Sequence, residues 1–411
     1  MSNSKSRMSM KRILQQVSAC ICAMILVLSA CKKDSQAPTV NYNVKVSYPA
    51  SYTSTVAVGV KVTLKNSVTN TTSVATTNAE GVATFNGILP GNYQVIASKD
   101  LTAEEALSLT GYSTAVYLNA SALNHVIQID AAPLDLVLNG SKVGGLVFKE
   151  VYYACSRTPG GTNYLIDQFY EIYNNSTEVV YADSLCIADV HGSPGNSASS
   201  KPTGFQSDVN NVYVRNIWMV PGNGKSHPIE PGKSIIIAQT AINHKTDPAG
   251  NPNSVDLGTG IADFEVYVNA AASKDVDNPD VPNMIQIYAP NAGFYWQTYV
   301  FGASMIIFKH ADPASLPLFT EPGTTSSTQL AQVPNANVID AVEFLASATV
   351  GDKKRIPVSL DAGFGYAGGT YTGESMVRKS KATGTNGRLI YQDTNNTTDD
   401  FKVVATPTPK K

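Results

Sequence analysis

Two glutamates lie inside apolar, strand-like segments, where an acidic side chain is unusual. Glu150 interrupts Leu146–Tyr153, and Glu171 interrupts Gln168–Tyr173. A pair of carboxyl groups can hydrolyse a glycosidic bond, one acting as acid and the other as nucleophile or base. Buried carboxylates are more commonly satisfied by hydrogen bonds from the backbone or from tyrosines. We therefore expect Glu150 and Glu171 to be structural or binding residues, with a polysaccharide hydrolase as the alternative.

Other residue types that perform catalysis lack the spacing that their chemistry needs. Gly-Lys-Ser occurs at 224–226 and 232–234, but the first glycine of a phosphate loop would fall on Met219 or His227. The sequence has no Gly-x-Ser-x-Gly elbow. Its five histidines show neither His-x-His nor His-Glu-x-x-His spacing. We therefore predict a protein that is not an enzyme and that carries no metal or cofactor.

Oxygen-bearing side chains crowd into residues 275–280, where Asp275, Asp277, Asn278 and Asp280 occur within six positions. Carboxylate and amide oxygens are the ligands that calcium prefers. The spacing of an EF-hand and its distal glutamate are missing, which favours a solvated acidic turn. Asp275, Asp277 and Asp280 are therefore weak calcium candidates.

Aromatic residues could supply flat surfaces for sugars or protein partners. The chain has twenty tyrosines and two tryptophans, Trp218 and Trp296. Large rings are mostly buried, and aromatic residues are common in sheets, so packing is their usual role. Trp218 lies between polar loops in the stretch from His191 to Pro228, so it is the better candidate for an exposed binding ring.

The composition predicts an all-β protein that must position these residues. Val, Ile, Thr and Tyr are plentiful relative to Leu, and the 30 glycines and 22 prolines are spread along the chain. A length of 411 residues suits two domains, each with its own core. The formal charge falls from −2 to −6 when the basic head segment, which has no acidic residue, is left out. The mildly acidic charge of the remaining chain argues against nucleic acid as a partner.

The first thirty residues, Met1–Ala30, have the three parts of a secretory signal peptide. Basic Lys11 and Arg12 precede an uncharged run from Val17 to Ala30. This run of fourteen residues is shorter than the roughly 20 that a spanning helix needs. We expect the segment to be removed rather than to cross the membrane.

Leu28-Ser29-Ala30-Cys31 resembles the lipobox of bacterial lipoproteins. The resemblance implies that Cys31 is acylated and that the mature chain is anchored to a membrane by its lipids. Lys32-Lys33-Asp34 resembles, in part, the signal that sends lipoproteins of Bacteroidetes-type bacteria to the outer face of the outer membrane. We expect an outer-membrane lipoprotein, displayed on the cell surface or facing the periplasm, with residues 31–40 as a lipidated tether.

Two cysteines, Cys155 and Cys186, remain in the mature chain once the signal peptide and Cys31 are accounted for. The envelope outside the cytoplasm is oxidising, so a disulfide between them is one expectation. Two buried, unpaired thiols are the other, because the sequence does not give their separation.

Residues 41–139 predict a first β module. Val58, Val60, Val62 and Leu64 alternate with polar neighbours, which is the period of a half-buried strand. Turn residues occur at 78–81, before Phe85, and at 90–91, before Tyr93. Each turn connects two predicted strands. This pattern resembles the carboxypeptidase-regulatory-like and Cna-B-like β-sandwiches, in which such a module is usually a spacer.

Residues 143–411 predict a second β module. Its segments 146–153, 168–176, 181–189 and 229–238, taken in that order, resemble a lamin-tail-like, immunoglobulin-type β-sandwich. Segments 338–343, 373–379 and 393–401 extend the resemblance to a Bacteroidetes lipoprotein family of unknown function. It implies that Glu150 and Glu171 lie close together. Cys186 replaces the usual tryptophan, and His191–Pro228 is interpreted as a long insertion.

We therefore expect two β-sandwich modules after a lipoprotein signal peptide, with a non-catalytic role in binding a ligand or partner. An outer-membrane receptor or a glycan would suit such a protein. The alternatives are the polysaccharide hydrolase and a purely structural envelope protein.

Overall fold

The computed structural model describes residues 38–50, 52–110, 116–142, 145–176, 179–246, 250–271, 273–290, 292–383 and 387–411. The predicted signal peptide, the lipidation at Cys31 and residues 31–37 of the tether lie outside these ranges. Among the described residues, no helix has the length and apolar character needed to cross a membrane. The chain is all-β, as predicted, with several sheets and almost no helix.

The N-terminal strands form two sheets around one hydrophobic core. A three-stranded sheet has the order β4-β1-β7, and a five-stranded sheet has the order β3-β2-β5-β6-β8. The helix α2 (Ala103–Thr110) connects β5 to β6. The strand bounds are β1 Val40–Ser47, β2 Lys61–Asn66, β3 Thr72–Thr76, β4 Val82–Ile88, β5 Gly91–Leu101, β6 Val116–Ile127, β7 Leu134–Val137 and β8 Asn139–Lys142.

Alternating apolar residues bring these strands together. In β2, Val62 and Leu64 are buried while Lys61 points outward, so one face of the strand contributes to the core. The turn before β4 is fixed by Asn78, whose side-chain oxygen accepts the backbone N–H of Val82 at 2.9 Å. Gly81 has φ +76°, and a Cβ there would lie 2.7 Å from a backbone oxygen of β1, so only glycine suits the turn. The predicted turn and the buried alternation of Val62 and Leu64 are therefore confirmed, whereas Val58 lies in a turn before β2 and is exposed.

The rest of the chain forms two larger sheets. A six-stranded sheet has the order β18-β17-β12-β9-β24-β27, and a seven-stranded sheet has the order β21-β22-β15-β14-β20-β23 with β19 paired to β15. The bounds in the first are β9 Leu146–Tyr152, β12 Phe169–Asn174, β17 Ser234–Ala238, β18 Phe264–Glu265, β24 Ser375–Arg378 and β27 Phe401–Val404. Those in the second are β14 Cys186–Val190, β15 Asn211–Met219, β19 Ile285–Tyr288, β20 Ser304–Phe308, β21 Leu318–Thr320, β22 Gln329–Pro334 and β23 Val338–Glu343.

One core lies between these two sheets. Phe148 and Ile172 come from the six-stranded sheet, and Ile187, Trp218 and Ile307 come from the seven-stranded sheet. A further apolar cluster covers the other side of the seven-stranded sheet. Its central strands are therefore buried on both faces.

Short elements complete the described chain. Two-stranded ladders join β10 to β11, β13 to β16 and β25 to β26. Their bounds, with those of the short helices, are β10 Ser156–Arg157, β11 Asn163–Tyr164, β13 Val180–Tyr181, β16 Pro228–Ile229, β25 Ser380–Thr383, β26 Leu389–Tyr391, η1 Pro313–Ser315, η2 Asn335–Asn337, η3 Gly351–Lys353 and α3 Thr397–Asp400.

The interpretation of His191–Pro228 as a long insertion is wrong for its central part. Strand β15 lies in this stretch and pairs with β14, β19 and β22. Most of its side chains are buried on both faces, so the segment lacks the simple alternation that marks a half-buried strand. The stretch therefore contributes a central strand of the larger core.

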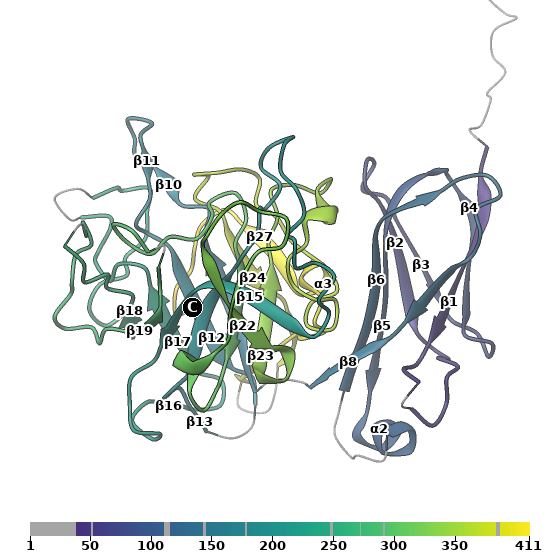
Figure 1. The fold of residues 1–411 in the computed structure, drawn as a ribbon, viewed down its shortest axis with the longest axis horizontal. Helices are drawn as coiled ribbons and strands as arrows, with labels where there is room; N and C mark the ends of the chain where they lie inside the picture. Colours follow the sequence, from purple (N-terminus) through teal and green to yellow (C-terminus); the bar gives the residue numbers. More distant parts are fainter. Residues whose placement is uncertain are drawn as a thin grey trace, which may run out of the picture.

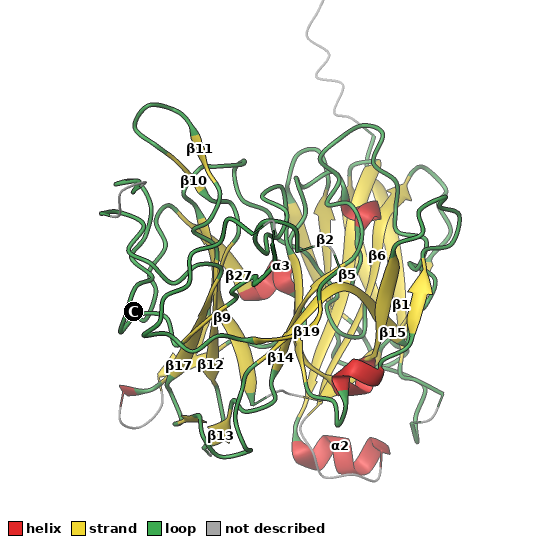
Figure 2. Ribbon diagram, turned by 60° about the vertical axis from the view of Figure 1, so that its left-hand side comes forward, coloured by secondary structure: helices red, strands yellow, loops and turns green. Residues whose placement is uncertain are grey.

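The N-terminal sheets stand beside the larger pair, as Figure 1 shows. Figure 2, coloured by secondary structure, shows that strands and loops make up nearly all of both parts. Asn119 on β6 is buried there, and its side-chain amide donates to the backbone oxygen of Thr394 at 2.6 Å. An exposed ion pair joins Lys381 to Asp100 at 3.6 Å. The buried Asn119 contact ties the five-stranded sheet to the C-terminal part of the chain, and the exposed ion pair adds little to it.

Candidate functional site

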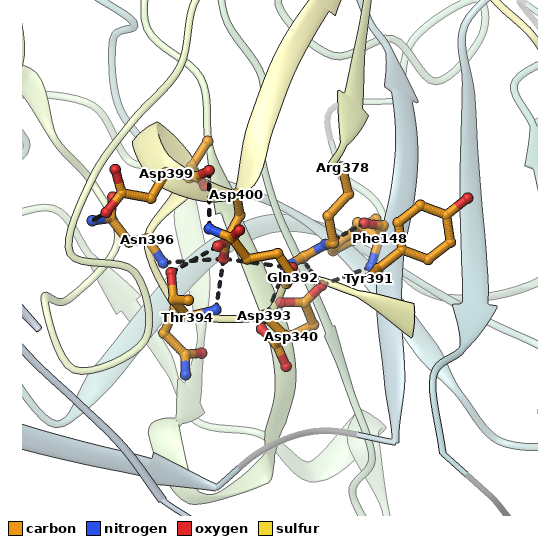
Figure 3. Close-up of polar contacts among 12 residues, drawn as sticks. Phe148, Asp340, Arg378, Tyr391, Gln392, Asp393, Thr394, Asn396, Asp399 and Asp400 are labelled. Atoms are coloured by element: carbon orange, nitrogen blue, oxygen red, sulfur yellow. Dashed lines mark hydrogen bonds and ion pairs between the residues drawn. The ribbon is translucent and has the colours of Figure 1, made fainter. Parts of the chain in front are cut away.

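Arg378 on β24 is the centre of a buried ion-pair cluster, which Figure 3 shows. Its guanidinium lies 2.5 Å from the carboxylate of Asp340, 3.3 Å from that of Asp393 and 3.4 Å from that of Asp400. The Nε atom also donates to the backbone oxygen of Phe148 at 2.7 Å. The Arg378 side chain is only 1% exposed. The cluster thus links β9, β23, β24 and α3.

Burial changes the acidity of this cluster. It raises the pKa of Asp393 to about 7 and that of Asp400 to about 6, while the positive charge of Arg378 opposes the rise. The pKa of Asp340 is also raised by burial. The guanidinium lies 4.7 Å from the ring centre of Phe401, which closes the remaining side. Since these groups are enclosed and bind one another, we assign the cluster a structural role.

Glu150 and Glu171 are direct neighbours across β9 and β12, as the resemblance implied. Both are fully buried. Glu150 accepts the backbone N–H of Thr408 at 3.0 Å and its hydroxyl at 3.1 Å, while burial raises the pKa of Glu150. Glu171 accepts the ammonium of Lys149 at 2.8 Å and the hydroxyl of Ser234. Both carboxyl groups are therefore enclosed and accept hydrogen bonds, although the second oxygen of Glu171 has no partner, and neither is exposed to a polysaccharide.

Cys155 and Cys186 are both free and buried. Burial raises the pKa of the Cys186 thiol to about 12 and that of the Cys155 thiol well above its usual value. A thiol with a raised pKa is a poor nucleophile at neutral pH. Of the two alternatives, the structure has the two unpaired thiols.

Trp218 does not provide an exposed ring, so its interpretation as a surface binding residue is wrong. It is fully buried on β15, and its ring centre lies 6.2 Å from that of Trp296, which is also buried. Both rings pack in the core between the two larger sheets.

The weak calcium candidates are used in local hydrogen bonds. The two carboxylate oxygens of Asp275 accept the Thr240 hydroxyl at 2.9 Å and the Val268 N–H at 3.1 Å. Asp277 accepts a side-chain amide, and the backbone N–H of Asp280 donates within its own turn. Across the residues that the structure describes, no group of three or more His, Cys, Asp or Glu is placed to hold a metal.

A polar hollow of 410 Å³ lies among loops at the ends of strands in the larger sheets. Residues that line it include His191, Ser193, Asn196, Lys201, Tyr299 and Glu321. A second hollow of 300 Å³ is lined by Tyr153, Asn196, Phe301, Ser347 and Thr370, among others. Asn196 lines both hollows, and we call the pair the aromatic groove because Tyr299 and Phe301 are 39% and 41% exposed.

A hydrogen bond between His191 and Glu321 fixes one wall of the aromatic groove. His191 Nε2 lies 2.8 Å from Glu321 Oε2, and the other oxygen of Glu321 accepts the backbone N–H of Gly204 at 2.8 Å. Burial favours the neutral acid, but the hydrogen bonds from Gly204, His191 and Thr203 outweigh it and hold the pKa of Glu321 below its usual value. Glu321 is therefore a carboxylate whose oxygens already have partners.

A chain of polar groups, which begins at the half-buried Arg215, holds the Tyr299 ring in place. The guanidinium of Arg215 lies 4.6 Å from the ring centre. Arg215 Nε in turn donates to the Asp189 carboxylate at 2.8 Å. The same carboxylate accepts hydrogen bonds from the side chains of Asn216 at 2.9 Å and Trp296 at 3.1 Å. A ring that is supported from below and still exposed is a pre-organised contact surface.

Arg355 hydrogen-bonds to two loops at the aromatic groove. It forms a buried ion pair with Glu343 at 2.9 Å and donates to the backbone oxygens of Gly192 at 3.3 Å and Gly302 at 3.2 Å. Gly302 closes the turn that carries Tyr299, because its N–H donates to the Tyr299 oxygen at 3.1 Å. Gly192 has φ +127°, and a Cβ there would lie 2.8 Å from Arg355 Cγ, so the wall requires glycine.

Sequence reasoning missed Tyr299 and Phe301. The signal that could have found them is the density of aromatic residues at 294–301, where five of eight positions are Phe, Tyr or Trp. One of these rings, Trp296, is buried, whereas Phe294, Tyr299 and Phe301 are exposed.

Comparison with known proteins gives a similarity to one family, over part of the chain, and no activity. Residues 230–408 match the model of a family described as "Protein of unknown function (DUF4876)". The crystal structure of a DUF4876 family protein from Bacteroides thetaiotaomicron is similar, with a TM-score of 0.57 and 29% sequence identity over 88% of this chain and 94% of that chain. No curated protein matches the sequence. Over residues 230–408, this chain is therefore similar to the DUF4876 family of proteins of unknown function.

Proposed function

We propose that this chain is a lipid-anchored outer-membrane protein of the cell surface that binds a ligand through the aromatic groove. The proposed location is supported by the signal-like segment Met1–Ala30, by the lipobox-like sequence ending at Cys31 and by Lys32-Lys33-Asp34. An anchored binding protein works by contact, so it needs an exposed and rigid surface rather than a catalytic group.

We propose two β-sandwich modules with different roles. The N-terminal sheets, with their own core, act as a carboxypeptidase-regulatory-like or Cna-B-like spacer, and the lamin-tail-like larger module presents the groove. The buried contact of Asn119 with Thr394 supports a spacer that holds the larger module in a defined orientation.

The observation that carries this proposal is the exposure of two large rings on a rigid turn. Tyr299 and Phe301 remain about 40% exposed although Arg215 and Arg355 fix the turn and its surroundings from below. Exposed aromatic residues on a pre-organised surface are common determinants of binding.

We expect the double substitution Tyr299→Ala and Phe301→Ala to weaken capture of the physiological ligand at least about tenfold, since hot-spot rings of this kind contribute about 2 kcal/mol or more. The measurement is a quantitative pull-down of envelope proteins and glycans with the mature chain. Deletion of His191–Pro228 is unsuitable because it would remove the core strand β15.

The matched control is Phe294→Ala, which removes a ring that is 51% exposed and does not line the groove. Capture by this variant should equal that of the unchanged chain. Equal capture by the double variant would refute binding through the groove.

Substitution Cys31→Ser should release the protein from the membrane fraction into the soluble fraction, because a serine hydroxyl is not a substrate for thiol acylation. Membrane fractionation and mass spectrometry of the mature N-terminus measure this outcome. A Cys186→Ser variant serves as the control, since that thiol is buried in a folded sheet. Retention of the Cys31→Ser variant in the membrane would contradict lipid anchoring.

A further inference from the structure

We propose that the aromatic groove binds a neutral glycan of at least two sugar units. This inference rests on the proposed binding function and names the chemical class of its ligand. It follows from the rings, the hydrogen-bonding groups, the charges and the shape of the two hollows.

Each hollow has its own exposed aromatic ring. Tyr299 lines the first and Phe301 lines the second. Sugar rings present an apolar C–H face and a rim of hydroxyl groups, so they suit a flat aromatic surface beside polar side chains. Because Asn196 lines both hollows, a ligand that covers both rings must be continuous across it.

The polar part of the lining is mainly hydroxyl and amide. Ser193 and Asn196 line the first hollow, and Ser347 and Thr370 line the second. Hydroxyl and amide groups both donate and accept hydrogen bonds, which matches the donor and acceptor character of sugar hydroxyls. The Ser193 hydroxyl donates to the Ser200 hydroxyl at 2.9 Å, which fixes its orientation.

The charges favour a ligand without net charge. Glu321 is the one acidic residue among those lining the groove, and its oxygens bind His191, Thr203 and Gly204. An anion would meet this carboxylate, and a cation would meet Lys201 at the exposed rim. A neutral ligand avoids the cost of desolvating or repelling either group.

The shape disfavours a peptide that adds to a sheet. The residues that line both hollows lie in loops and turns, and none belongs to a strand. Strand addition requires a row of unpaired backbone groups at a sheet edge, which this groove does not present. We therefore place the glycan ahead of an extended peptide.

The test uses the mature chain and a panel of neutral gluco-, manno-, galacto- and xylo-oligosaccharides of one to six units, measured by isothermal titration calorimetry. At least one series should bind, with affinity rising from the monosaccharide to the di- or trisaccharide as the second hollow fills. Tyr299→Ala and Phe301→Ala should each weaken the best oligosaccharide at least about tenfold. Phe301→Ala should leave the monosaccharide affinity nearer to that of the unchanged chain if the first hollow is the primary subsite.

Tyr299→Phe keeps the ring and should retain most of the affinity, whereas Phe294→Ala should leave it unchanged. Circular dichroism and thermal melting identify any variant that fails to fold. If no neutral oligosaccharide binds but Tyr299→Ala and Phe301→Ala abolish capture of a protein partner, the glycan inference fails and the proposed binding function stands. Preferred binding of acidic oligosaccharides that depends on Lys201 would also overturn the glycan inference. If no ligand of any kind binds in a way that depends on the groove, the glycan inference and the proposed binding function both fail.

Discussion

Replacement of Arg378 by methionine is expected to lower the free energy of unfolding by about 3–5 kcal/mol, the range found when one partner of a buried ion pair is removed. Methionine has a similar length but no charge and no donors. The carboxylates of Asp340, Asp393 and Asp400 would then remain enclosed without their cation, and the backbone oxygen of Phe148 would lose its donor.

The stability that Arg378→Met loses should depend on pH in a defined direction. Burial raises the pKa of Asp393 to about 7 and that of Asp400 to about 6, above the value near 3.9 of an unfolded aspartate. The folded state therefore binds more protons than the unfolded state between about pH 4 and pH 7, and acidification across this window stabilises it. Without Arg378 these pKa values rise further, so the variant should recover stability between pH 8 and pH 5 more steeply than the unchanged chain.

Denaturant unfolding at several pH values measures both effects. Lys381→Met is the control, because Lys381 is exposed and its ion pair with Asp100 contributes little. A loss below about 1 kcal/mol for Arg378→Met, or a loss that grows on acidification to pH 5, would show that the cluster does not hold the C-terminal strands as described.

Replacement of Arg355 by methionine is expected to have a second large effect, again about 3–5 kcal/mol, together with weaker ligand binding. The change leaves Glu343 buried beside Lys354, whose ammonium is 3.8 Å away. It also frees the backbone oxygens of Gly192 and Gly302, which belong to the groove wall and to the Tyr299 turn. Both loops should then lose their fixed positions, so affinity falls although Arg355 itself does not line the groove.

A double-mutant cycle with Glu343→Gln separates the ion pair from the other contacts. Because the two residues interact directly, the double variant should lose less stability than the sum of the single variants. Arg355→Lys tests geometry at constant charge, and it should still weaken ligand binding because one ammonium cannot reach both carbonyls and Glu343 as the planar guanidinium does. Unchanged affinity in a folded Arg355→Met protein would show that Arg355 does not position the groove.

The all-β class and many of the strands could be predicted from the residues alone. Val62 and Leu64 alternate with polar residues, and the turn at Asn78 and Gly81 relies on backbone preferences of those residues. These signals are local, because a strand period and a turn type are set by residues within a few positions of each other. The proximity of Glu150 and Glu171 followed from the order of segments in a resembled fold and agrees with their cross-strand pairing.

The exposure of each aromatic ring, by contrast, depends on contacts between residues far apart in the chain. Trp218 is enclosed because β15 is covered on both faces, which its own sequence does not reveal. His191 meets Glu321 across 130 residues, and Arg355 reaches Gly192 across 163. Such contacts depend on how the loops of different strands meet at one end of two sheets, and no local periodicity records that arrangement.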